Sequence, residues 1–284
     1  MPRDEQALSF RCGDETLHGV LSPADGGATR GVLIVVGGPQ YRAGSHRQFV
    51  LLARALAAQG IPAMRFDYRG MGDGSGAVSS FEEVDDDLRA AIDAFTAAVP
   101  GLREVVLWGL CDAASAALFY AAQDARIAGL VLLNPWVRTA QGQARATLKH
   151  YYRDRLLQPA FWRKLVSGRF ALGASLRSLL GQVKQARQAG ADTDAAQRPV
   201  RQPLRPRMLA GLQAFRGPVL LIISGRDLTA QEFLDLEQAE QPWRQALSAP
   251  RVSRQRLDEA DHTFSSQAWR DQVAAWTGDW VRAW

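Results

Sequence analysis

Cysteine and histidine are scarce in this chain. Its 284 residues include two cysteines, Cys12 and Cys111, and four histidines. Two cysteines cannot build the disulfide framework of a small secreted domain, so we expect a reducing, cytoplasmic environment. The cysteines and histidines also lack the spacing of metal ligands, and we therefore expect no metal.

Long apolar segments and ligand-binding signatures are also missing. No run of about 18 uncharged apolar residues occurs, so we expect no transmembrane helix. The opening segment MPRDEQALSF has no apolar stretch, so we expect no secretory signal peptide. The segment GGPQYRAG lacks the G-x-G-x-x-G spacing and no nucleic-acid-binding motif is present, so we expect neither a dinucleotide nor another cofactor, and no nucleic acid partner.

The charge is distributed unevenly. The whole chain has a net charge of +5. Residues 138–207 contain 15 Lys and Arg against three acidic residues, a net charge of +12, whereas the remainder carries −7. Such a contrast indicates a segment with its own role or its own partner.

Apolar runs alternate with helical patterns in the first half of the chain. Residues 7–24 predict two short strands with a turn near Gly13. We expect further strands within 31–38, 61–76, 104–110 and 127–136, with helices at 46–59, about 80–99 and 111–123. The glycine-rich end of 61–76 predicts a loop, and Ser79 or Ser80 followed by Glu82 and Glu83 resembles a capping box.

This alternation stops at residue 137 and resumes near residue 216. Residues 197–207 contain three prolines and are not expected to form regular helix. A strand at 217–227, a helix near 230–247, a strand at 252–257 and a helix at about 266–283 follow. The pattern predicts an α/β fold with a mostly parallel sheet of about eight strands. We expect the core to comprise 1–136 and 216–284, with a basic helical cap or lid at 137–215.

A candidate nucleophile lies where a buried strand meets a helix. In Gly109-Leu110-Cys111-Asp112-Ala113 the residues two positions from Cys111 are small, as a sharp strand-to-helix turn requires. The N-terminus of the helix stabilises a thiolate, which is the reactive form. A buried structural cysteine is the alternative.

The base and the acid should follow the nucleophile in that topology, in the order nucleophile, acid, histidine. After Cys111 only His150 and His262 remain, and His150 lies in the insertion. His262 lies in the loop between the last strand and the last helix. Asp227 stands at the end of the expected strand 217–227. We expect His262 to act as the base and Asp227 to orient its ring. Weaker candidates for the acid are Glu232 and Asp235.

An acyl-transfer site also needs hydrogen-bond donors for the developing oxyanion. One expected donor is the N–H of Asp112, and the other comes from the loop 37–40. Proline has no N–H, so Gly38 or Gln40 must supply it, and we favour Gln40. His46 lies close behind and is a candidate lining residue, unless Ser45 simply caps the next helix.

Together these motifs resemble the α/β-hydrolase superfamily over nearly the whole chain. They are VVGGPQ, FDYRGMGDGSG, GLCDA, SGRD and ADHTF. FDYRGMGDGSG is similar to the superfamily's Asp-x-Arg-Gly-x-Gly-x-Ser loop, which we take to be structural. The cysteine elbow is similar to that of dienelactone hydrolases, and GGPQYRAGSHRQFVLLARAL with LWGLCDAASAALFYA looks closest to the hydrolase 1 family associated with the exosortase A system. The genes of that family accompany bacterial exopolysaccharide and protein-sorting loci.

The resemblance implies an α/β-hydrolase fold, the catalytic positions and a hydrolase or acyltransferase activity, but no substrate. Three residues depart from the superfamily pattern. Gly37 stands where many members have histidine, Cys111 replaces the usual serine, and Asp112 puts a carboxylate beside the nucleophile. That negative charge opposes a thiolate unless an arginine from the insertion neutralises it.

Three interpretations of the basic insertion stay open. It forms a solvated helical surface, or it attracts an anionic acyl substrate, or it contacts an anionic membrane surface through its aromatic residues, such as Phe161 and Trp162. We expect a small-molecule acyl substrate, an ester or thioester, processed through an S-acyl intermediate. The alternative is a non-catalytic binding module, and the sequence leaves the oligomeric state open.

Overall fold

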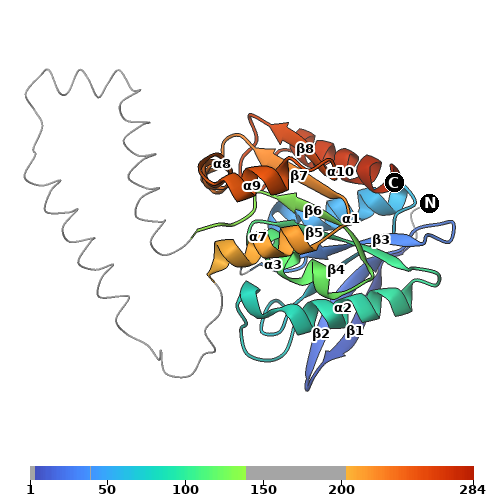
Figure 1. Cartoon of the computed structure of the whole chain (residues 1–284). Helices are drawn as coiled ribbons and strands as arrows, with labels where there is room; N and C mark the ends of the chain where they lie inside the picture. Colours follow the sequence, from blue (N-terminus) through green and yellow to red (C-terminus); the bar gives the residue numbers. More distant parts are fainter. Residues whose placement is uncertain (1–3, 39, 139–202) are drawn as a thin grey trace, which may run out of the picture. The chain divides into compact units, whose positions relative to one another are not determined.

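The computed structural model describes residues 4–38, 40–138 and 203–284 (Figure 1). Residues 4–137 and 204–284 form one compact unit. Most of the expected lid, including His150, Phe161 and Trp162, lies outside the described residues. No helix in the described ranges is long and apolar enough to cross a membrane.

A single eight-stranded sheet forms the centre of this unit, as the sequence predicts. Its strands are β1 Gln6–Cys12, β2 Glu15–Ser22, β3 Arg30–Val35, β4 Ala63–Asp67, β5 Glu104–Leu110, β6 Ile127–Leu133, β7 Val219–Ser224 and β8 Val252–Leu257. The spatial order is β1-β2-β4-β3-β5-β6-β7-β8. β2 pairs antiparallel with β1 and β4, and all later pairs are parallel. The strands β3, β5 and β7 are apolar except at one end, where Arg30, Glu104 and Ser224 stand, because helices cover both faces of the sheet.

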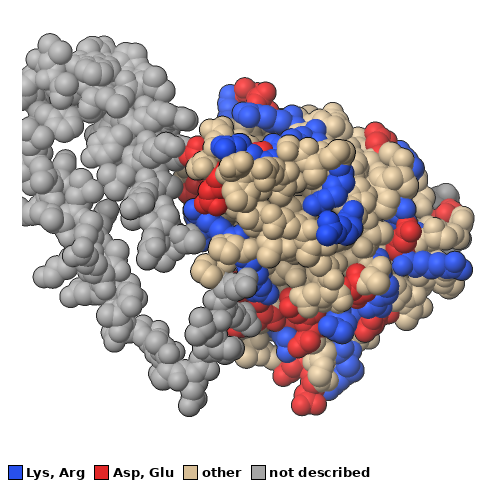
Figure 2. Space-filling model, viewed as in Figure 1, with Lys and Arg blue, Asp and Glu red and all other residues tan. Residues whose placement is uncertain are grey.

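Helices occupy both sides of the sheet. They are α1 Gln48–Ala58, α2 Asp85–Ala98, α3 Asp112–Tyr120, α7 Leu204–Ala214, α8 Leu228–Ala239, α9 Gln241–Leu247 and α10 Gln267–Arg282. α1 packs against α10, and α2, α3, α7 and α9 contact one another in sequence (Figure 1). Lys and Arg side chains alternate with Asp and Glu on the described part of the face in Figure 2, without a large area of one sign.

The expected end of the insertion is corrected by α7. Helix begins at Leu204, inside the segment expected to be irregular, because Pro206 lies in the first turn, where no N–H is needed. Arg205 donates to the carbonyl of Val137 at 3.0 Å, and Arg207 lies over the ring of Phe119 at 3.8 Å. Part of the basic segment therefore packs on the core unit.

Two helix boundaries also differ from expectation. Ser45 is not the cap of α1, because His46 and Arg47 have positive φ angles of 52° and 59° and the helix begins at Gln48. The helix expected near 230–247 is two helices, since Glu240 is extended and Pro242 begins a new first turn. Ser80 does accept an N–H bond from Glu82, but it caps a 3-10 turn, Phe81–Glu83, that precedes α2.

The loop after β4 is held by a buried carboxylate, which agrees with the structural role expected for FDYRGMGDGSG. Asp67 is 1% exposed and accepts bonds from the N–H of Arg42 at 2.7 Å and the N–H of Asp73 at 3.1 Å. It also pairs with the Arg42 guanidinium. A Cβ at Gly72 would meet the Asp67 carboxylate, so this position requires glycine. The network joins the loop after β3 to the loop after β4.

Replacing Asp67 should therefore destabilise the fold. Asp67→Ala leaves Arg42 without its buried partner, and we expect the free energy of unfolding to fall by about 3 kcal/mol. Asp73→Ala is the matched control, because Asp73 pairs with the same guanidinium but its side chain is 56% exposed. We expect this control to leave the free energy of unfolding close to that of the wild type, because an exposed ion pair contributes little. Denaturant unfolding measures both, and equal losses would contradict the role given to Asp67.

Candidate active site

Cys111 occupies the turn between β5 and α3. Its φ and ψ are 64° and −123°, a conformation that costs roughly 1–3 kcal/mol and persists only where neighbours enforce it. Its N–H donates to the carbonyl of Leu133 at 2.9 Å, and its carbonyl accepts from Trp136 at 3.1 Å. A Cβ at Gly109 would lie 2.6 Å from the Ala113 backbone, so glycine is needed there. This is the sharp strand-to-helix turn that the sequence motif predicts, and Cys111 is half-buried in it.

His262 and Asp227 meet at the carboxyl end of the sheet. The Nδ1 atom of His262 lies 2.8 Å from Oδ2 of Asp227. Asp227 also caps α8, because its carboxylate accepts the N–H groups of Thr229 at 3.1 Å and Ala230 at 3.0 Å. These bonds fix the carboxylate, and the carboxylate fixes the imidazole. The weaker acid candidates Glu232 and Asp235 lie within α8.

The electrostatic surroundings favour the imidazolium form of His262. Burial disfavours the charged ring, but its hydrogen bonds to the Asp227 carboxylate and to the Cys111 side chain outweigh burial and raise the pKa of His262 to about 10. The stabilisation from this charged ring is complete below the ordinary histidine pKa of about 6.5 and is lost as the pH rises through about 10. The Nδ1 atom is engaged by Asp227, so Nε2 is the atom left to face the sulfur.

Asn134 positions the His262 loop, and the sequence analysis missed it. It is fully buried just beyond β6, and its Nδ2 donates to Ser224 Oγ at 2.8 Å and to the His262 carbonyl at 3.1 Å. Its Oδ1 accepts the N–H of Ser224 at 2.9 Å. The available signal was a lone amide side chain after the apolar run LVLL, at the edge where the other candidates lie.

The N–H groups of Gly38 and Gln40, the two donors expected from the loop after β3, both bond acceptors within the protein. The N–H of Gln40 donates to the carbonyl of Gly38 at 2.8 Å, so it is engaged within the turn. The Gln40 side chain accepts from the N–H of Ser45 at 3.3 Å and thereby holds the loop. Gly38 is the better candidate of the two by position, but its N–H donates to Asp112 Oδ2 at 2.9 Å. Our preference for Gln40 is therefore corrected.

Asp112 begins α3, as expected for the residue after the nucleophile. Its carboxylate oxygens accept from Gly38 and, at 2.9 Å, from the N–H of Ala113. Within the described residues no ion pair involves Asp112. Arg205 and Arg207 of the expected insertion bond Val137 and Glu82 instead, and the arginines between 139 and 202 lie outside the described residues. His46 lies in a short 3-10 helix, Ser45–Arg47, and makes no hydrogen bond to the other candidates in the described ranges.

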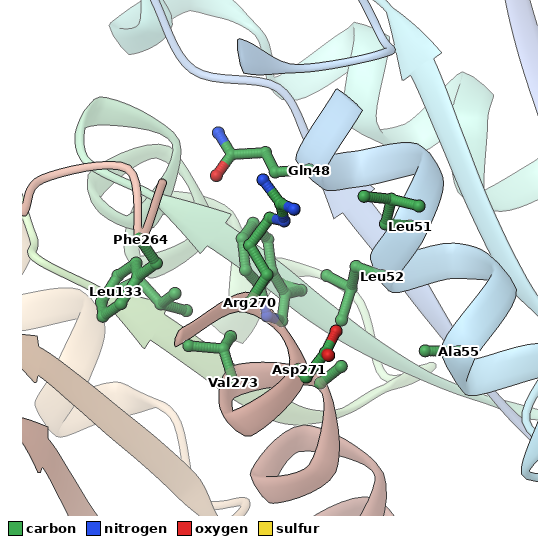
Figure 3. Close-up of a pocket in the computed structure, with 11 residues that line it drawn as sticks. Gln48, Leu51, Leu52, Ala55, Leu133, Phe264, Arg270, Asp271 and Val273 are labelled. Atoms are coloured by element: carbon green, nitrogen blue, oxygen red, sulfur yellow. The ribbon is translucent and has the colours of Figure 1, made fainter. Parts of the chain in front are cut away.

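A small cavity adjoins the site between α1 and α10 (Figure 3). Its volume is about 30 Å³, and Leu133 and Phe264 link its lining to the Cys111 turn and the His262 loop. Gln48 and Arg270 reach toward each other across it. In the described part of the chain, Gln48 Nε2, Trp108 Nε1 and Arg270 Nε are buried without a partner. All three are donors, so the cavity suits water or a small acceptor group.

The sheet order, the strained turn and the His262–Asp227 pair define an α/β hydrolase. Residues 27–276 match the model of the alpha/beta hydrolase family, and the chain belongs to that family. Membership of that family makes the protein a hydrolase. Among curated proteins none matches the chain.

Several solved structures share the fold. An esterase from Pyrococcus furiosus is 17% identical with a TM-score of 0.66, and the alignment covers 99% of this chain and 91% of that one. An esterase domain of a Rhodothermus marinus protein is 21% identical with a TM-score of 0.60, covering 98% of each chain. Proline iminopeptidase from Mycobacterium smegmatis is 14% identical with a TM-score of 0.59, covering 97% of each. At these identities the likeness concerns the fold alone.

Asn134 offers a test of how the site is held. Asn134→Ala removes three hydrogen bonds and strands the N–H of Ser224, so we expect the free energy of unfolding to fall by about 2–3 kcal/mol. Gln123→Ala is the control, because the Gln123 amide bonds Asp85 at the surface. We expect that change to cost about 0.5 kcal/mol or less. Denaturant unfolding distinguishes the two, and a loss as small as the control's would contradict the role of Asn134.

Proposed function

We propose that this hydrolase cleaves an ester or thioester through an S-acyl intermediate on Cys111, and that the acyl group then passes to water or to another acceptor. One observation carries the proposal: the strained Cys111 turn at the start of α3 lies beside an imidazole that is hydrogen-bonded to a fixed carboxylate. A nucleophile, a base and an orienting group in this relation are the signature of covalent catalysis.

The proposed first half-reaction starts from the sulfur. His262 holds the proton given up by the thiol, the thiolate attacks the acyl carbon, and a carbon–sulfur bond forms while the carbonyl electron pair moves to oxygen. The tetrahedral intermediate then collapses, the bond to the leaving group breaks, and the leaving alkoxide or thiolate takes the proton from His262. An imidazolium facing the sulfur supports this step because it favours the thiolate.

The second half-reaction resolves the thioester. Water, an alcohol or an amine attacks the acyl carbon, His262 takes its proton, and the Cys111 sulfur leaves as the thiolate. Asp227 keeps the imidazole in one orientation through both halves. A thioester transfers readily to any of these acceptors, so hydrolysis and acyl transfer are both within the proposal.

The finer parts of the proposal concern the setting. We propose that the chain works in the cytoplasm, where a free thiol persists, and that it serves the exosortase-linked exopolysaccharide systems whose hydrolase 1 family it resembles. We further propose that the basic insertion expected at residues 137–215, most of which lies outside the described residues, is a lid whose charge attracts an anionic acyl substrate. A solvated surface and contact with an anionic membrane are the alternatives for that segment.

The nucleophile is tested by comparing the two cysteines. Cys111→Ala should lower turnover of p-nitrophenyl acetate by about 10³-fold or more. Cys12→Ala should leave turnover unchanged, because Cys12 is buried at the end of β1. Intact-mass spectra of acid-quenched reactions should show the acyl adduct on the wild type and on Cys12→Ala only. An unmodified wild type without ester turnover would instead favour a non-catalytic binding module.

The acid is tested by a second matched pair. Asp227→Asn should lower turnover by about 10²–10⁴-fold, because an amide no longer stabilises the imidazolium. It should leave the fold stable, since asparagine also caps helices. Asp235→Asn is the control on the same helix, and its turnover should match the wild type. If Asp235→Asn carried the loss instead, Asp227 would not be the acid. Initial rates and thermal unfolding are the measurements.

A further inference from the structure

The Asp112 carboxylate lies where the substrate's oxygen is expected. Oδ2 accepts the N–H of Gly38 at 2.9 Å, and Oδ1 accepts the N–H of Ala113 at 2.9 Å. Both donors flank the nucleophile, one in the loop after β3 and one in the first turn of α3. The N–H of Gly38 is one of the donors expected for an oxyanion in acyl transfer, and the other expected donor, the N–H of Asp112 itself, also bonds the carboxyl and lowers its pKa. In this arrangement the protein's own carboxylate uses them.

The surrounding backbone is shaped to admit this carboxylate. A Cβ at Gly37 would lie 2.3 Å from Asp112 Oδ1 and 2.7 Å from the carbonyl of Leu110. A larger residue at 37 would therefore displace the carboxylate from its donors. The N–H of Gln40 is engaged by Gly38, so it offers no substitute. Gly37 and Asp112 both depart from the superfamily pattern. The two departures go together, because the missing side chain of Gly37 leaves the room that the Asp112 carboxylate occupies.

Burial and the neighbouring polar and charged groups act in opposite directions on the pKa of Asp112. Burial raises the pKa of Asp112, although the N–H groups of Gly38 and Ala113 and the charge of His262 lower it. On the β4 side lies Tyr68, which is 3% exposed and whose hydroxyl has no partner among the described residues. The charge of Asp112 adds to burial in raising the pKa of Tyr68. Cys111 adjoins Asp112 in the chain.

We infer that Asp112 is a further catalytic residue of the proposed acyl transfer, and that it works as a neutral acid in the oxyanion site. When ionised, the carboxylate occupies the Gly38 and Ala113 donors and repels the developing oxyanion. When neutral, one oxygen still accepts from Gly38, while the other donates its O–H to the carbonyl oxygen of the substrate. This inference rests on the proposed function.

The step balances without a further reactant. The thiolate of Cys111 forms the carbon–sulfur bond, and the carbonyl electron pair moves to the oxygen that Asp112 holds by hydrogen bond. Collapse of the intermediate returns that pair to the carbon–oxygen bond and expels the leaving group, which takes its proton from His262. Asp112 keeps its proton throughout, so its role is to stabilise charge.

A pH series tests the inference. Asp112→Asn is isosteric and always neutral, and its amide both accepts from Gly38 and donates to the substrate. We expect the ratio of kcat/KM for p-nitrophenyl acetate, Asp112→Asn over wild type, to be near one at acidic pH. Above the carboxyl titration, the ratio should rise by up to about tenfold per pH unit. A ratio that does not change with pH, or Asp112→Asn slower at every pH, would overturn the inference.

Two further variants complete the experiment. Asp112→Ala has no donor and should be at least about tenfold slower than Asp112→Asn; equal rates would overturn the donor role. Asp279→Asn removes an exposed carboxylate of α10 and should follow the wild-type pH profile. Detection of the acyl adduct on Cys111 distinguishes failure of the proposed function from failure of the inference about Asp112. If the wild type forms no adduct, the proposed function fails; if it forms the adduct and Asp112→Asn follows the wild-type profile, only this inference fails.

Discussion

The site depends on one backbone turn that an L-amino acid rarely adopts. The positive φ at Cys111 separates the end of β5 at Leu110 from the start of α3 at Asp112, so this residue stands at the carboxyl end of the strand. Such a conformation is retained only where its surroundings over-determine it. Here the neighbouring strand β6 supplies the hydrogen bonds at Leu133 and beyond, and the missing side chain of Gly109 leaves room for α3. The core therefore holds the strained turn that carries the half-buried Cys111.

The order of the strands brings the other groups to that turn. β5, β6, β7 and β8 are consecutive in the sheet and parallel, so their carboxyl ends lie along one edge. Cys111 follows β5, Asn134 follows β6, Asp227 lies beyond β7 and His262 follows β8. Open α/β sheets bind ligands at this edge for the same reason. Four parts of the chain that are distant in sequence thereby converge.

At the N-terminus of α3, a carboxylate of the protein itself accepts the backbone N–H groups. A helix N-terminus and a nearby loop ordinarily offer N–H groups to a substrate anion. In this chain Asp112 engages those groups, and Gly37 provides the space for its carboxylate. The same dipole that favours a thiolate at Cys111 also favours this carboxylate, so the two negative groups compete for one source of stabilisation. Under the proposed mechanism, the charge state of Asp112 bears directly on acyl transfer.

The sequence by itself determined the alternation of strands and helices, the position of Cys111 at a strand-to-helix turn, and the chain order of Asp227 and His262. These are local patterns: an apolar run ends, small residues flank a turn, and a polar residue follows. It did not determine that the N–H of Gln40 would donate to the carbonyl of Gly38, or that α1 would begin after two residues of positive φ. Nor did it determine that Asn134 would connect β7 to the His262 loop through hydrogen bonds. Gly38 and Asp112 are 74 positions apart, and Asn134 and His262 are 128 apart. Only the folded sheet decides which donor and acceptor meet over such separations, because a hydrogen bond depends on distance in space and leaves no periodic trace in the sequence.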